Sequence, residues 1–174
     1  MESPHGIKFS AFRPPVMGRN GMVTSGHPLA SQAGIQAMMA GGNAVDAAIA
    51  TAAALGVVEP HSSGVGGDGF ILIYWAETGT ITCVNATGPA PYAATRELYL
   101  QNGGIPMKGI RSVSVPGVVD GWLIAHERYG ALKLKQVFEP ALSLCENGFP
   151  VSYKLAAGIE GENPRFAAEP HTRA

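Results

Sequence analysis

The stretch Gly64-Val65-Gly66-Gly67-Asp68-Gly69-Phe70 decides how the fold is read, because its glycines have the spacing of a dinucleotide-binding loop. That motif requires a strand before the glycines and a helix after them, whose N-terminus receives the pyrophosphate. Here the order is reversed, since residues 44–55 are rich in alanine and typical of a buried helix, while the apolar and aromatic run Phe70–Trp75 is typical of a strand. We therefore predict a helix-to-strand connection. A nucleotide-binding module ranks behind the two functions discussed below, and a helix rather than a strand at Phe70–Trp75 would support it.

The composition limits the possible partners and locations. A chain of 174 residues suits a single domain, residues 1–174. A formal net charge of -1, with 12 scattered Lys and Arg residues, argues against a nucleic-acid partner. No apolar stretch approaches the ~20 residues that span a bilayer, and residues 1–8 lack the apolar core of a secretory signal. We expect a cytoplasmic protein with no membrane span.

The helix after residue 43 has a clear start and an unusual composition. Gly41-Gly42 ends the preceding helix, which begins at Pro28 and runs to about residue 40. Asn43 is a good N-cap, and Asp46 stands at the N3 position, where its carboxylate can accept hydrogen bonds from free backbone N–H groups. We interpret Asp46 as a capping residue rather than a catalytic acid. Because alanine occupies nearly every face of residues 44–55, this helix should be packed on several sides.

The remaining elements predict an α+β fold. Charged residues are 14% of the chain and apolar residues 46%, so much of the chain should be buried, in part against another polypeptide. After Pro150 we predict no further regular element. The other predicted elements are a short strand at 21–25, an antiparallel hairpin of Phe70–Trp75 with Thr80–Asn85, and helices at 96–100, 118–128 and 134–147, the last kinked or restarted at Pro140.

Few residues indicate chemistry within this chain. Cys83 and Cys145 are far apart in the sequence, and we expect two buried, reduced thiols. Ser62-Ser63 does not lie in a nucleophile elbow. Asn85-Ala86-Thr87 is a glycosylation sequon without a secretory route. The five histidines are His5, His27, His61, His126 and His171. They do not pair at helical spacing, so we expect no metal and no cofactor. We interpret His27 and His126 as structural.

Several separated blocks of the sequence occur together in a recognisable order. They are Val23-Thr24-Ser25-Gly26-His27-Pro28-Leu29-Ala30-Ser31, Gly41-Gly42-Asn43-Ala44-Val45-Asp46-Ala47-Ala48, Val57-Val58-Glu59-Pro60 and Ser63-Gly64-Val65-Gly66-Gly67-Asp68-Gly69-Phe70. In this order they closely resemble the γ-glutamyltranspeptidase family. The similarity continues through Ser114-Val115-Pro116-Gly117 and up to Gly148-Phe149-Pro150-Val151, and it covers roughly residues 21–151.

The resemblance implies an Ntn-hydrolase with an αββα sandwich, of which this chain holds the first half only. Such an enzyme is made as a zymogen that cleaves itself into a large and a small subunit. A threonine at the new N-terminus attacks a γ-glutamyl amide, such as that of glutathione, with its own α-amino group as the base. Cephalosporin acylases are similar in chain organisation. This chain resembles only the opening part of the large subunit, so we expect no catalytic residue in it and no activity from it alone.

One position departs from the family pattern. The family's carboxylate-binding arginine lies in an Arg-Glu-x-Ala-Pro segment, and alignment on Ala90-Pro91 puts Thr87 at that position. Losing the two charge-assisted hydrogen bonds of a guanidinium should weaken substrate binding by about 2 kcal/mol or more. Arg96 or Arg111 could supply the charge, although no spacing places either there. The form Asn85–Pro91 resembles the cytoplasmic, transpeptidase-like branch of uncertain substrate.

Two functions remain open. The leading hypothesis is an amidohydrolase or acyltransferase of γ-glutamyl or related amides, which needs a small catalytic subunit. The alternative is a non-catalytic, truncated remnant that acts as a scaffold or self-associates. In the family, the glycine loop is either scaffold, with glycines for close approach and positive φ, or a direct substrate contact through its N–H groups.

Overall fold

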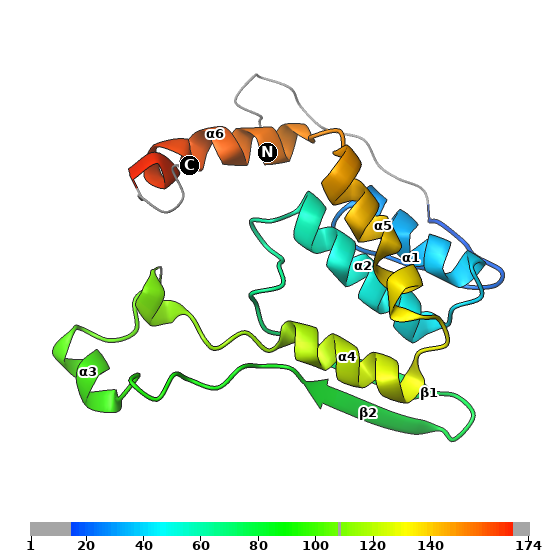
Figure 1. Ribbon diagram of the computed structural model, residues 1–174, viewed down its shortest axis with the longest axis horizontal. Helices are drawn as coiled ribbons and strands as arrows, with labels where there is room; N and C mark the ends of the chain where they lie inside the picture. Colours follow the sequence, from blue (N-terminus) through cyan, green and yellow to red (C-terminus); the bar gives the residue numbers. More distant parts are fainter. Residues whose placement is uncertain (1–14, 108, 169–174) are drawn as a thin grey trace. The chain divides into compact units, whose positions relative to one another are not determined.

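The computed structural model describes residues 15–107 and 109–168 (Figure 1). Two compact units are distinguished: Val23–Asn147, and a second unit of Met1–Met22 with Gly148–Ala174. The expectation of a single domain stays a prediction. Residues 1–8 of the predicted N-terminus, together with His171, lie outside the described residues.

Unit Val23–Asn147 begins with two packed helices, α1 (Pro28–Met39) and α2 (Ala44–Val58). Gly41, in the turn between them, has a φ of 94°, a conformation that glycine adopts without strain. The Asn43 side chain accepts hydrogen bonds from the N–H groups of Val45 and Asp46, and the Asp46 carboxylate accepts one from the Asn43 N–H. This capping box confirms the predicted role of Asp46.

Helix α2 is the centre of the helical layer. It contacts α1, α4 (Val118–Tyr129) and α5 (Leu134–Asn147), and Figure 1 shows α1, α2 and α5 grouped together. The buried residues of α2 are Val45, Asp46, Ala47, Ile49, Ala50, Thr51, Ala54 and Val58. Because several of them are small alanines, the neighbouring helices approach closely, and the prediction that this helix is packed on several sides is confirmed.

Two antiparallel strands, β1 (Phe70–Trp75) and β2 (Thr80–Asn85), follow the glycine loop as predicted. The order helix, glycines, strand excludes the dinucleotide fold, because no helix N-terminus follows the glycines. Side chains of the inner face pack against α4, where the Tyr129 hydroxyl donates to Thr82 Oγ1 at 3.0 Å and the Tyr129 ring lies 5.3 Å from the Trp75 ring. Ile73 and Val84 of this inner face are buried in the core.

The other face of the hairpin is apolar and open. Leu72, Tyr74 and Ile81 are between 65% and 73% exposed. Cys83 pairs with Leu72 in the strand register, and it is exposed as well. Cys145 of α5 is also exposed, so both thiols are free but the prediction that they are buried was wrong. Alternation along β2 turns Cys83 away from the core that receives Val84.

Three further predictions need correction. Residues 21–25 form no strand, because no described strand lies beside them to complete a ladder. Helix α5 continues through Pro140, so a restart there was wrong, while the alternative of a kink stays a prediction. The second unit contains a helix that we did not predict, α6 (Tyr153–Ala168), whose Gly158, Gly161 and Pro164 lower its helix propensity.

Two short elements, α3 (Arg96–Gln101) and the 3₁₀-helix η1 (Ile110–Ser112), lie between β2 and α4 in the chain. Thr95 is the N-cap of α3, and its side-chain oxygen accepts a hydrogen bond from the Leu98 N–H at 3.3 Å. No described helix has the length and apolarity to cross a membrane. The cytoplasmic location stays a prediction.

Candidate functional site

Asp68, in the glycine loop, joins three segments that are far apart in the sequence. Its Oδ1 atom accepts a hydrogen bond from the Gly88 N–H at 2.9 Å, just after β2. Its Oδ2 atom accepts one from the Ser114 hydroxyl, just before α4. The Gly88 hydrogen bond, and then that of Ser114, lowers the pKa of Asp68, because both stabilise the charged form. The exposed carboxylate is therefore ionised at neutral pH.

Backbone hydrogen bonds hold the same three segments together. Gly69 and Ala86 exchange two N–H to carbonyl bonds of 3.3 and 2.9 Å, which extend the hairpin by one pair. The Gly67 carbonyl accepts from the N–H groups of Gly117 and Val118 at 3.2 and 3.1 Å, where α4 begins. The loop is thus a junction of the hairpin with α4, and Asp68 is the side chain at its centre.

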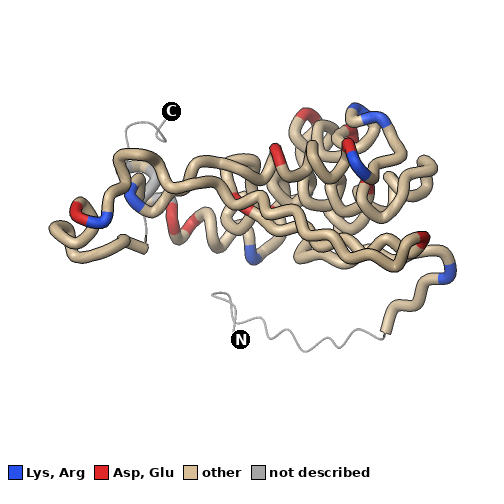
Figure 2. The backbone as a smooth tube through the Cα atoms, turned by 90° about the horizontal axis from the view of Figure 1, so that it is seen from below, with Lys and Arg blue, Asp and Glu red and all other residues tan. Residues whose placement is uncertain are grey.

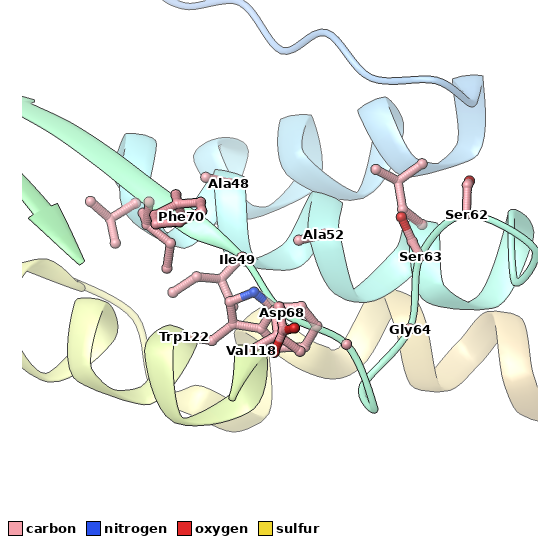
Figure 3. A pocket seen from close by; sticks show the side chains of 15 residues that line it. Ala48, Ile49, Ala52, Ser62, Ser63, Gly64, Asp68, Phe70, Val118 and Trp122 are labelled. Carbon is pink, nitrogen blue, oxygen red and sulfur yellow. The ribbon is translucent and has the colours of Figure 1, made fainter. Parts of the chain in front are cut away.

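A pocket of about 430 Å³ opens beside this junction (Figure 3). Its lining is mostly apolar, and its polar side-chain groups include the Asp68 carboxylate, the hydroxyls of Ser62 and Ser63 and the indole N–H of Trp122. A concave apolar surface with a few polar groups suits a small organic ligand. Apolar lining residues include Ala48, Ala52 and Leu55 of α2, Phe70 of β1, and Val118 and Trp122 of α4.

Thr87 precedes Gly88 in the segment that Asp68 holds. Its side chain is exposed. The Thr87 N–H donates to Asn85 Oδ1 at 3.0 Å, and the Thr87 hydroxyl donates to the same oxygen at 2.5 Å. Because the hydroxyl proton is used in this local turn, the Thr87 oxygen has only its lone pairs left, as an acceptor.

The comparisons with known proteins identify the family. A family model described as γ-glutamyltranspeptidase matches residues 30–174. This chain belongs to the γ-glutamyltranspeptidase family. It is 43% identical over 158 residues to the glutathione hydrolase-like YwrD proenzyme of Bacillus subtilis (strain 168). The matched region covers 90% of this chain and 30% of that protein.

Other relatives include an acylase. The chain is 37% identical over 182 residues to the Acylase ACY 1 proenzyme of Pseudomonas sp. (strain SE83), with 96% of this chain and 32% of that protein covered. The crystal structure of Helicobacter pylori γ-glutamyltranspeptidase superposes with a TM-score of 0.83 at 34% identity, over 91% of this chain and 47% of that one. This chain spans about a third of the length of these curated relatives and has part of the α+β Ntn-hydrolase fold.

Arg96 and Arg111, the two candidates to replace the family arginine, lie in other elements than Thr87. Arg96 begins α3 and Arg111 lies in η1, whose position is held in part by a hydrogen bond from the Tyr99 hydroxyl to the Arg111 carbonyl at 2.7 Å. Within the described residues, neither arginine forms an ion pair with Asp68. Lys and Arg are spread along the backbone rather than gathered into one patch (Figure 2). The role of Thr87 in binding stays a prediction.

At this junction the most severe steric need for glycine lies outside the glycine loop, at Gly88 and Gly117. No glycine of the loop has a positive φ, so that part of the prediction was wrong. Gly64 and Gly66 have open space around them, whereas a Cβ at Gly67 would lie 3.3 Å from the Gly64 carbonyl oxygen. A Cβ at Gly88 would overlap the Val115 carbonyl oxygen, and one at Gly117 would lie 2.6 Å from the Ala86 carbonyl oxygen. Their neighbours Pro89 and Pro116 mark turns, which is the signal that could have found them.

Two histidines have structural roles, as predicted. His27 Nδ1 accepts a hydrogen bond from the Leu29 N–H at 3.2 Å and caps α1. His126 Nε2 lies 2.8 Å from the Leu132 carbonyl oxygen and 3.7 Å from Asp46 Oδ1. Within the described residues no group of His, Cys, Asp and Glu is arranged to hold a metal ion. His5 and His171 lie outside this part of the chain.

Proposed function

We propose that this chain is the N-terminal part of the large subunit of an enzyme that cleaves γ-glutamyl or related amide bonds. The supporting observation is that 90% of the chain matches a proenzyme of which it spans 30%, so most of the catalytic assembly lies outside it. The nucleophile is a threonine at the N-terminus of a small subunit, supplied by a segment not in this chain.

The reaction divides into two acyl transfers. The threonine hydroxyl adds to the amide carbonyl, its proton passes through the threonine α-amino group to the leaving amine, and an acyl ester forms. Water or an acceptor amine then attacks the ester and releases the threonine. In this scheme the junction at Asp68 and the pocket beside it hold part of the acyl donor.

The open face of the hairpin supports a protein partner. A small catalytic subunit would cover Leu72, Tyr74 and Ile81, whose exposure would otherwise leave an apolar surface in water. The alternative function, a non-catalytic remnant used as a scaffold, would instead cover this face by self-association.

The first test is the intact mass and N-terminal sequence of the protein expressed from its complete native locus. We expect two chains in equal amounts, of which the second begins with threonine, and release of amine from amide donors. A single chain that ends near residue 174, without turnover, would contradict the enzyme and support the remnant.

Thiol labelling tests the covered face. In the isolated chain, Cys83 and Cys145 should both react with a maleimide, because both are exposed. In the two-subunit enzyme we expect Cys83 to react at least about tenfold more slowly, since the partner excludes the reagent from the hairpin. Denatured protein gives the reference rate for each thiol. An unchanged Cys83 rate in the assembled enzyme would count against a partner on this face.

A further inference from the structure

We infer that the loop around Asp68 and Thr87 selects acyl donors without a carboxylate at this place, and that Asp68 is the residue that sets this charge preference. The inference rests on the proposed function and adds a substrate class to it, namely amides of uncharged acyl groups.

The polar groups of the junction are mainly hydrogen-bond acceptors. The Thr87 hydroxyl donates to Asn85 Oδ1, which leaves its lone pairs for a ligand. Each Asp68 oxygen accepts one hydrogen bond within the protein and can accept another. The Asn85 amide NH₂ is a donor, but it is neutral. A bound carboxylate needs donors, preferably cationic ones, so this arrangement suits it poorly.

The Asp68 carboxylate is held against the peptide group that joins Thr87 to Gly88. Asp68 Oδ1 lies 2.9 Å from the Gly88 nitrogen, and this nitrogen is bonded directly to the carbonyl carbon of Thr87. A donor carboxylate bound at Thr87 would therefore sit beside a like charge, and within the described residues no Lys or Arg forms an ion pair with Asp68 that would offset the repulsion. The lowered pKa of Asp68 keeps this repulsion in place at neutral pH.

The adjoining pocket supplies the attractive part of the selection. Ala48, Ala52 and Phe70 line it, and Asp68 is on its wall (Figure 3). An aliphatic or aromatic acyl chain would bury its apolar surface there, which is favourable in proportion to the area removed from water. A negatively charged acyl chain would lose its hydration and meet no cationic side chain among the residues that line the pocket.

The test uses the assembled enzyme and two donors that differ by one carboxylate, glutaryl-p-nitroanilide and butyryl-p-nitroanilide. We expect the wild type to have the higher kcat/KM for the butyryl donor. Asp68→Asn should raise the glutaryl-to-butyryl ratio of kcat/KM by about three- to tenfold, mainly through the KM of the glutaryl donor. The asparagine can still accept from the Gly88 N–H, so the loop is kept while the charge is removed.

Glu77→Gln is the matched control, because it removes one negative charge from the exposed turn between β1 and β2. It should leave the donor ratio unchanged. If Asp68→Asn lowers kcat/KM equally for both donors, Asp68 has a structural role only and the inference is wrong.

A binding experiment distinguishes a failure of this inference from a failure of the proposed function. Backbone amide shifts of Gly88 can be titrated with butyramide and with glutaramate, its analogue with one added carboxylate, whether or not turnover occurs. We expect the wild type to bind butyramide more tightly than glutaramate, and we expect the two affinities to differ less in Asp68→Asn. Equal affinities for both amides in the wild type would overturn the inference, and no turnover with any donor would overturn only the proposed function.

Discussion

Replacing Asp46 with alanine is expected to lower the free energy of unfolding by about 3–5 kcal/mol. Asp46 is fully buried, and its Oδ2 atom accepts from the N–H groups of Asn43, Ala131 and Leu132 at 2.9, 3.0 and 3.3 Å. Alanine would leave these three donors without their partner in the interior, and an unsatisfied buried donor loses its hydration without compensation. The effect is large because one carboxylate both caps α2 and holds the loop that follows α4.

Urea denaturation followed by circular dichroism measures this change. Glu146→Ala is the matched control, since Glu146 is an exposed carboxylate in the last turn of α5, and its loss should change the free energy of unfolding by less than about 0.5 kcal/mol. Asp46→Asn should fall between the two, because the amide oxygen can replace some of the acceptor contacts. A loss below about 1 kcal/mol for Asp46→Ala would mean that water replaces the carboxylate.

The second large effect is expected for Gly88→Ala, at about 2–3 kcal/mol. The added Cβ would overlap the Val115 carbonyl oxygen, so the segment after β2 must move away from the segment before α4. That movement would break the Gly88 hydrogen bond to Asp68 and the 3.1 Å hydrogen bond from the Val115 N–H to the Pro89 carbonyl. The junction would open even though the substitution adds a single methyl group.

Gly66→Ala provides the comparison, because a Cβ at Gly66 meets nothing within 4 Å and its φ is not positive. Its midpoint of thermal unfolding should stay within about 1 °C of wild type, whereas Gly88→Ala should lower it by several degrees. Similar midpoints for the two variants would show that the segments at Gly88 and Val115 separate without cost.

Local patterns of the sequence were sufficient for most of the helices and strands. The Asn43 cap with Asp46 at N3, the glycine-containing loop between two strand-like runs and the spacing of apolar residues in α5 each act over a few residues, and each was confirmed. α6 was missed because two glycines and a proline lower its intrinsic propensity. The burial of Cys83 was misjudged because residue type does not tell which face of a hairpin is covered.

The sequence by itself determined the family and the order of elements, since helix caps, strand alternation and separated blocks of similarity are all read along the chain. It also pointed to Thr87, through alignment. Only the tertiary structure showed that Asp68 joins Gly88 and Ser114, because these partners are 20 and 46 residues away and no local pattern links them. Only the tertiary structure also showed that a side chain fits at Gly64 but would overlap a neighbouring carbonyl at Gly88, because such crowding depends on which backbone segments lie side by side.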